Sequence, residues 1–390
     1  MSTKTDVDFR ISMLAPSRAG KTTLLASIYN VLRERTTESG YQVGFDKANQ
    51  MLLNILKNEY EAIFATAQKK FEETGERIFS PSMGIKPSVE QTSYKIFIHT
   101  PEQQDFYDKR KSIPEMLAGI LFRDYPGGLL DNPEEFPEDL IDHITLSRVM
   151  LVPIPADILE EYSKNTENAH VYKHAKTYLN VESICEQLQK WIKQHVEREE
   201  ECYLCFVPVK CEHFFNDNGG KADRSEELFE LVENNFISKI KLSDNAKKMV
   251  QIDIRPVDTY GISEYSHAEI TEDSWMSFFK IRETFQKFET PKARTKGVFE
   301  LFVSILNFIL SSSARSAGVK KDELISRVKN RSVFDHIKVA LGKLLGQKDD
   351  VAVQAQILTS KETAFILMAD GIAAMANDDL SRVKKINSID

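Results

Sequence analysis

The chain has 390 residues, of which 42% are hydrophobic and 28% are charged. These values are typical of a folded globular protein and exclude a chain that is disordered over most of its length. The formal net charge of -8 argues against a general affinity for nucleic acid. Four cysteines are too few to cross-link a protein of this size, and the polar N-terminus has no apolar segment of signal-peptide length. We therefore expect a cytoplasmic protein with reduced thiols.

A strand is predicted over residues 9–14, and the residues after it form the most informative motif of the sequence. They are Ala15, Pro16, Ser17, Arg18, Ala19, Gly20, Lys21, Thr22 and Thr23. A strand, a loop that ends in Gly-Lys-Thr and a helix, in this order, are the parts of a phosphate-binding loop. In such a loop the backbone N–H groups surround the phosphates, the lysine reaches the β and γ oxygens, and the hydroxyl ligates Mg²⁺. We expect residues Ser17 to Thr23 to bind a nucleotide, with Lys21 acting on the phosphates and Thr22 on the metal.

A long helical pattern over 47–73 follows the first helix and predicts a helical insertion at about 45–75. Residues 78–91 contain two prolines and a glycine, so we expect a loop there. Strands come next at 94–98, where apolar and polar residues alternate, and at 119–123, which is almost continuously apolar.

The second of these strands leads into Asp124-Tyr125-Pro126-Gly127. Three further strands are expected at 148–154, 203–209 and 250–254. A helical pattern covers 171–198. Six strands that alternate with helices indicate an α/β fold with a mostly parallel sheet and helices on both faces. Ligands of such sheets bind at the carboxyl ends of the strands, which is where the Asp-x-x-Gly segment lies.

Strand signals nearly vanish after residue 274, so we expect residues 1–290 to form the α/β domain and 291–390 an all-helical C-terminal module. The module has 16 Lys and Arg against 11 Asp and Glu, a balance of +5. This balance favours a solvated helical face, with an acidic partner or an anionic membrane surface as the alternatives, and we expect a protein partner for the module. Its apolar segment 298–310 is too short to span a bilayer and predicts a buried or docking helix. A loop is expected at 311–318.

Three elements at the carboxyl ends of predicted strands, namely the loop at 15–23, the Asp-x-x-Gly segment and Val209-Lys210-Cys211-Glu212, resemble the translation-factor-related class of P-loop GTPases over about residues 8–262. Within that class, the sequence looks most like outlying bacterial GTPases with long switch-region insertions and helical extensions. The resemblance implies that GTP and Mg²⁺ are the ligands. It also implies that Asp124 lies near Mg²⁺ and that the N–H of Gly127 senses the γ-phosphate.

The class recognises the guanine base with Asn/Thr-Lys-x-Asp, and this chain has Val209-Lys210-Cys211-Glu212 in that place. Lys210 matches the motif, and Glu212 retains the carboxylate with one more methylene. The resemblance implies that these two residues contact the base, with ATP as the alternative ligand. A further loop that touches the base in this class corresponds to Val257, Asp258 and Thr259.

The first switch of the class supplies a Ser or Thr to Mg²⁺ and the γ-phosphate. The candidates in this chain are Ser80, Ser82, Ser88 and Thr92. Many members follow Asp-x-x-Gly with a Gln that orients the attacking water, whereas this chain has Gly128, so we expect slow hydrolysis. Arg18 and Arg123 each have two possible roles. One is to neutralise the negative charge that develops during hydrolysis, and the other is to pack at the surface.

Two functions remain open from the sequence. One is a GTPase switch whose state is read by a protein partner of the C-terminal module, and the other is a nucleotide-binding scaffold with little turnover. The substitution of Ala15 for the first glycine of the strict loop pattern gives the second some weight.

A zinc site is a weaker alternative. Cys202, Cys205 and Cys211 lie near His213, but residues three apart on a strand face opposite sides, so we do not expect Cys202 and Cys205 to share a metal. His170 and His174 are expected on a solvated helix face.

Overall fold

The computed structural model describes most of the α/β region and parts of the remainder. The described residues are 9–16, 19–38, 42–43, 54, 58, 61–62, 65–66, 68–75, 78–79, 92–99, 118–124, 127–131, 136–165, 167–215, 223–259, 263–270, 275–281, 295–316, 320–322, 325–326, 369–370, 372–373 and 383–386.

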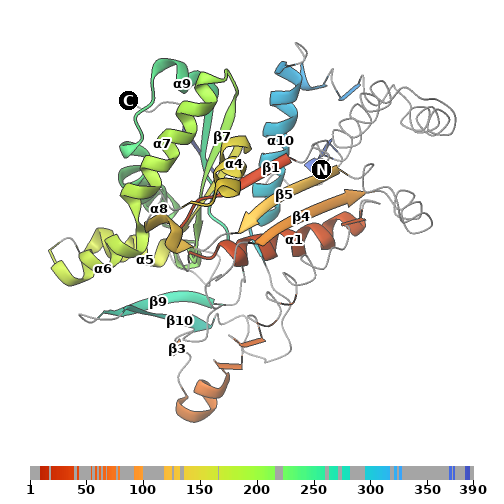
Figure 1. Cartoon of the computed structure of the whole chain (residues 1–390). Helices are drawn as coiled ribbons and strands as arrows, with labels where there is room; N and C mark the ends of the chain where they lie inside the picture. Colours follow the sequence, from red (N-terminus) through yellow and green to blue (C-terminus); the bar gives the residue numbers. More distant parts are fainter. Residues whose placement is uncertain are drawn as a thin grey trace.

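Within these residues the main sheet has eight strands in the order β11-β8-β7-β6-β1-β5-β4-β2 (Figure 1). They are β1 (Phe9–Met13), β2 (Gln42–Val43), β4 (Thr92–His99), β5 (Ala118–Asp124), β6 (Val149–Pro155), β7 (Cys202–Val209), β8 (Val250–Ile254) and β11 (Lys384–Ile386). The five central strands, β5, β1, β6, β7 and β8, are parallel, and β4, β2 and β11 are attached by antiparallel pairing. All six predicted strands are present, and the mostly parallel sheet is confirmed.

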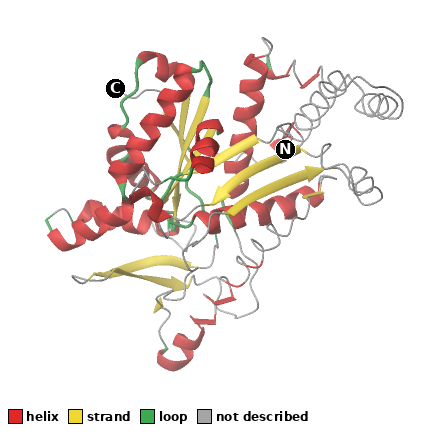
Figure 2. Cartoon of the chain, in the orientation of Figure 1, coloured by secondary structure: helices red, strands yellow, loops and turns green. Residues whose placement is uncertain are grey.

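Helices cover both faces of this sheet (Figure 2). One face packs against α1 (Lys21–Glu38) and α10 (Val298–Ser316). The other packs against α4 (Glu138–Leu146), α5 (Ala156–Lys164), α6 (Ala169–Leu179), α7 (Val181–Glu197), α8 (Ser225–Asn235) and α9 (Asp244–Met249). Strands β6 and β7 are buried along their whole length because alternate residues enter the two layers: Leu151 lies in the α1 layer and Met150 in the α7 layer.

Strand β1 is the point at which the sheet order reverses. Its neighbours β5 and β6 are consecutive parallel strands in the chain but lie on opposite sides of it. The chain therefore leaves β1 toward the side of β5 and leaves the adjacent β6 toward the side of β7, which opens a crevice at the carboxyl ends of β1 and β6, where ligands of open α/β sheets bind. Residues 15–23 follow β1 at this position.

Two elements beyond residue 290 pack directly with the α/β region. Helix α10 lies against α1 and buries Phe302 and Ile305 in the same core, and the ring of Phe308 stacks on Tyr203 with centroids 5.4 Å apart. The window Val298–Arg315 is long and apolar enough to cross a membrane, but 67% of it is buried inside the fold, as in a core helix. Strand β11 pairs with β8. The division at residue 290 stays a prediction, and residues 327–368 lie outside the described ranges.

The expectation that strand signals end near residue 274 is wrong. A second sheet has the order β3-β10-β9, formed by β3 (Ile78–Phe79), β10 (Trp275–Ile281) and β9 (Ser263–Ile270). It lies beneath α5 and α6 in Figure 1. Strand β9 has a weak apolar signal, since Tyr265 is the only buried residue among those of β9 whose burial the structure describes. Strand β10 has five apolar residues out of seven, so its own sequence favours a strand. The start of the loop expected at 78–91 is thus a short strand, and its remainder lies outside the described residues.

Two helix boundaries also differ from expectation. The helical pattern at 171–198 is divided between α6 and α7 at Asn180, whose φ of 47° is left-handed, a conformation that asparagine tolerates better than most residues. The loop expected at 311–318 is helical as far as Ser316, because Ser312 and Ala314 are buried and Ser312 accepts a hydrogen bond from Arg148. The described residues from 54 to 74 are helical, as expected of the insertion.

Candidate functional site

The loop at residues 15–23 begins as an extension of β1. The N–H of Leu14 donates to the carbonyl of Leu151 at 2.8 Å, which continues the pairing of β1 with β6. Gly20 has a φ of +86°, a left-handed conformation that a side chain would strain, and its carbonyl accepts from the N–H of Leu24 at 2.8 Å as α1 begins. Ser17 and Arg18 lie outside the described residues, and Ala19 is buried.

Lys21, the first residue of α1, folds back over this loop. Its Nζ donates to the carbonyl of Ala15 at 2.9 Å and to that of Pro16 at 3.0 Å, and the residue is only 6% exposed. We expected the ammonium to face a ligand rather than the core. Its enclosure shows that Lys21 also contributes to the structure of the loop.

The first turn of α1 supplies backbone N–H groups at the carboxyl end of β1. The leading N–H groups of a helix have no partner within the helix, and they lie at the positive end of its dipole. Thr22 is partly buried and Thr23 is buried. The hydroxyl of Ser27 donates to the carbonyl of Thr23 at 2.8 Å and to that of Thr259 at 3.3 Å. This contact brings the loop at 257–259 against α1.

Strands β4 and β5 bring two other predicted residues together. Thr92 is the first residue of β4 and Asp124 the last of β5, and the two pair directly in the antiparallel register. Directly opposed residues have Cβ atoms about 5 Å apart. Ser80, Ser82 and Ser88, the other candidates for the first switch, lie outside the described residues.

The residues after β5 form a short 3₁₀ helix, η2 (Gly127–Asp131), in which Gly128 is exposed. Arg123, at the end of β5, donates to both the carbonyl and the carboxylate of Asp139 on α4, with 2.5 Å between its Nη2 and Oδ2. This pairing favours the packing interpretation of Arg123.

The end of β7 lies next to the loop at 15–23. A Cβ built on Gly20 would be 3.7 Å from Cγ2 of Val209, the last residue of β7. Lys210 follows with a φ of 56°, and its side chain is 37% exposed. Glu212 begins the 3₁₀ helix η4 (Glu212–Phe214) and is 6% exposed. Both predicted base-contacting residues therefore lie at the same edge of the sheet as Lys21.

Asp157 is a residue that the sequence reasoning missed. It lies in the first turn of α5, directly after β6, and is completely buried. Its Oδ2 accepts a hydrogen bond from the Ser277 hydroxyl at 3.0 Å and lies 4.0 Å from Nζ of Lys210. Its Oδ1 has no hydrogen-bond partner in the part of the chain that the structure describes. The available signal was an acidic residue just beyond a buried parallel strand.

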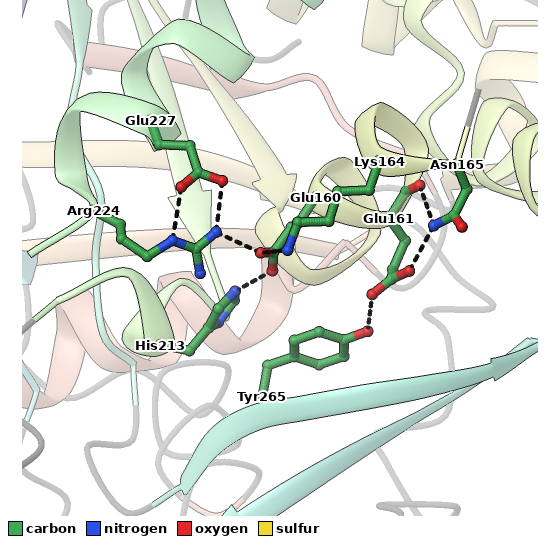
Figure 3. Close-up of polar contacts among 8 residues, drawn as sticks. All are labelled: Glu160, Glu161, Lys164, Asn165, His213, Arg224, Glu227 and Tyr265. Carbon is green, nitrogen blue, oxygen red and sulfur yellow. Dashed lines mark hydrogen bonds and ion pairs between the residues drawn. The ribbon is translucent and has the colours of Figure 1, made fainter. Parts of the chain in front are cut away.

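A second buried carboxylate, Glu160, joins α5 to η4 and α8 (Figure 3). It accepts from Nε2 of His213 and Nη2 of Arg224, both at 2.6 Å, and from Lys164. Burial alone would raise the pKa of Glu160, but the hydrogen bonds from these three residues outweigh it and hold the pKa well below its usual range. Arg224 also pairs with Glu227.

The second sheet is attached to α5 by a neighbouring contact (Figure 3). The hydroxyl of Tyr265 on β9 donates to Oε1 of Glu161 at 2.9 Å, and Asn165 donates to the other oxygen, also at 2.9 Å. Burial, followed by the adjacent Glu161 carboxylate, raises the pKa of Tyr265. Together with the bond from Ser277 to Asp157, this contact holds the strands β9 and β10 against the edge of the candidate site.

The zinc alternative receives no support from the described residues. Cys202 and Cys205 enter opposite core layers, as expected from strand geometry. No group of three potential metal-binding His, Cys, Asp or Glu residues occurs within the described ranges. His170 and His174 lie on α6.

Comparison with known proteins leaves the site to be interpreted from its own geometry. No family model matches the chain, and no curated protein matches it.

Proposed function

We propose that this protein is a nucleotide-dependent switch that binds GTP with Mg²⁺ and hydrolyses it slowly. One observation carries the proposal: at the start of α1, the Lys21 ammonium donates to the carbonyls of Ala15 and Pro16, which follow the end of β1. The position at the reversal point of the sheet, the left-handed Gly20 and the positive helix end all favour a bound polyphosphate there. When a nucleotide binds, the Lys21 ammonium leaves the carbonyls of Ala15 and Pro16 and contacts phosphate oxygens instead.

The pairing of Thr92 with Asp124 supports a Mg²⁺ site beside this loop. In the proposal, the Thr22 hydroxyl and the Asp124 carboxylate hold the ion and its water molecules, and Thr92 is the residue of the first switch. Hard oxygen ligands of this kind suit Mg²⁺, which retains several waters when it binds. The N–H of Gly127 is then available to the γ-phosphate.

Base recognition is assigned to the segment after β7. Lys210 is accessible enough for its aliphatic stem to pack beside a base, whereas Glu212 is nearly enclosed. Guanine selectivity through Glu212 therefore requires the base to reach a buried carboxylate. The preference for GTP over ATP depends on this contact, because an adenine would leave the carboxylate without its N–H donors.

A scaffold with little turnover is the second candidate function. It is favoured by Gly128, which is exposed and offers no side chain to orient a water molecule. The nucleotide would then hold a conformation for a partner without being consumed.

Turnover and competition measurements separate these readings. GTP and ATP hydrolysis is measured with Mg²⁺, together with the nucleotide content of the purified protein. Slow GTP turnover with weak displacement by ATP is the result expected for the switch. Tightly retained nucleotide without turnover supports the scaffold, equal potency of ATP and GTP contradicts recognition by Glu212, and no binding of either contradicts the proposal.

A further inference from the structure

The buried carboxylate of Asp157 is the most unusual charge placement in the candidate site. The residue is fully enclosed, and its Oδ1 has no partner among the described residues. A buried carboxylate is stable only when it is paired or hydrogen-bonded, and each missing partner is unfavourable. One hydrogen bond from Ser277 at 3.0 Å and one cation at 4.0 Å leave the acceptor capacity of Asp157 only partly used.

The cation is Lys210, and its backbone is strained. Its φ of 56° is unfavourable for a residue with a Cβ atom, and such conformations persist where the surrounding structure enforces them. The chain turns sharply here, and the next residues, Cys211 and Glu212, are buried while the Lys210 side chain stays 37% exposed. The turn thus holds a flexible lysine at the carboxyl edge of the sheet with its ammonium directed toward Asp157.

We propose that Asp157 is the positioning residue for Lys210 and sets nucleotide affinity through it; this inference rests on the proposed function. A free lysine side chain loses rotamer entropy when it is fixed, and a buried carboxylate lowers that cost by holding the ammonium beforehand. At 4.0 Å the pair is at the outer limit of an ion pair, so the ammonium can move closer to Oδ1, which has no partner among the described residues, when a base packs on the lysine stem.

The same carboxylate also contacts β10 through Ser277, so a structural role in holding the second sheet must be distinguished from positioning. Substitution at Ser277 offers the matched control, because it removes the contact with the sheet and leaves the pair with Lys210. Asp157→Asn retains the shape and an oxygen acceptor for Ser277 but removes the charge.

A double-mutant cycle in nucleotide affinity tests the proposal. GDP and GTP binding is titrated for the full chain, Asp157→Asn, Lys210→Ala, the double variant and Ser277→Ala. Asp157→Asn is expected to weaken binding about tenfold in the parent and less than about twofold in the Lys210→Ala background, because coupled neighbours are not additive. Ser277→Ala is expected to stay within about twofold of the parent.

Two results overturn the inference alone. The first is that Asp157→Asn weakens nucleotide binding equally in the parent and in the Lys210→Ala background. The second is that Ser277→Ala loses as much nucleotide affinity as Asp157→Asn does. If Asp157→Asn does not fold, Lys210→Arg and Lys210→Gln decide: positioning predicts that Arg retains most of the affinity and Gln does not, and equal losses contradict it. Absence of nucleotide binding by the parent chain would instead remove the proposed function itself.

Discussion

At the scale of single residues, several left-handed backbone positions lie where the chain turns toward the candidate site. Gly20 precedes Lys21, Lys210 follows β7, and Gly297 precedes α10. Gly297, with a φ of +74°, also has a close neighbour: a Cβ atom there would lie 2.7 Å from the carbonyl oxygen of Pro256. The adjacent Lys296 forms a two-hydrogen-bond bridge with Asp258, so the start of α10 is fixed against the loop after β8.

Gly297→Ala is therefore expected to destabilise the protein by at least about 2 kcal/mol, because left-handed strain and the clash with a backbone oxygen add. The matched control is Gly75→Ala. Gly75 has a φ of +70°, and no atom of the described residues lies within 4 Å of the added Cβ, so the loss there is expected to be about 1 kcal/mol. Urea unfolding of both variants measures the difference. Equal losses of stability would show that the close carbonyl oxygen of Pro256 adds nothing to the cost of the alanine side chain at 297.

At the scale of elements, buried polar contacts connect α5 to η4 and α8, and α4 to β1. Glu160 accepts hydrogen bonds from η4 and from the residue before α8, so one carboxylate joins three segments of the chain. His143 of α4 is within hydrogen-bond distance of the carbonyl of Ile11 in β1, with 3.1 Å from its Nε2 to that oxygen. Both groups lie beneath the surface, where a missing partner is costly.

Glu160→Gln should lower the free energy of unfolding by about 3 kcal/mol, since it removes the charge of a buried carboxylate that accepts hydrogen bonds from His213, Arg224 and Lys164. Glu227→Gln is the control on the same arginine. Its side chain is 42% exposed, so a loss below about 1 kcal/mol is expected. Denaturant titrations at pH 7 provide the comparison. Similar small losses of stability for both variants would mean that solvent screens the contacts of Glu160 as well as it screens an exposed ion pair.

The pH dependence of stability should carry the signature of His143. Burial lowers the pKa of its imidazole from 6.5 to about 4, so the unfolded chain takes up a proton at a pH where the folded chain does not. Stability is therefore complete above pH 6.5 and falls as the pH drops toward 4, with a loss of about 1.5 kcal/mol from this residue between pH 6.5 and 5. His195, whose pKa is also lowered by burial, acts in the same direction.

The measurement is the free energy of unfolding at several values of pH from 7 to 5, in the parent, His143→Gln and His170→Gln. The glutamine amide at 143 can still donate to the carbonyl of Ile11 but does not titrate, so the free energy of unfolding should change less steeply with pH than in the parent. The exposed His170 should leave it unchanged. If the free energy of unfolding of His143→Gln changes with pH as steeply as that of the parent, the assignment of this pH dependence to His143 is contradicted.

At the scale of the whole molecule, local sequence patterns predict the central strands well and the peripheral ones poorly. Strands β6 and β7 are buried on both faces, so their apolar runs are visible without any tertiary information. Strands β9 and β10 are held by contacts such as those from Tyr265 to Glu161 and from Ser277 to Asp157, which join residues more than 100 positions apart. No window of sequence contains both partners of these contacts, so the packing of the second sheet against α5 could not be predicted, although the pairing of β9 with β10 is local. An acidic residue just beyond β6 was a local signal for Asp157, but its burial depends on distant segments.

The candidate site also has some features with a local sequence signal and others without one. The connection from β1 to α1 at 15–23 could be predicted because its signal lies in adjacent residues, and the structure brings it, the pairing of Thr92 with Asp124, and Lys210 to one edge of the sheet. Phosphate binding by this loop stays a prediction. The enclosure of Lys21 and Glu212 depends on the packing of distant segments and has no local signature. Partner binding by residues 291–390 stays a prediction.

The central claim is that the loop holding Lys21 binds a nucleoside triphosphate with Mg²⁺. Calorimetric titration of GTP with Mg²⁺ into the parent, Lys21→Ala and Lys193→Ala tests it most directly, with circular dichroism to verify that each variant is folded. Lys193 is the control because its side chain is 77% exposed on α7. We predict saturable binding by the parent and by Lys193→Ala, and affinity at least about thirtyfold weaker for Lys21→Ala. Binding by a folded Lys21→Ala variant as tight as that of the parent would contradict the account.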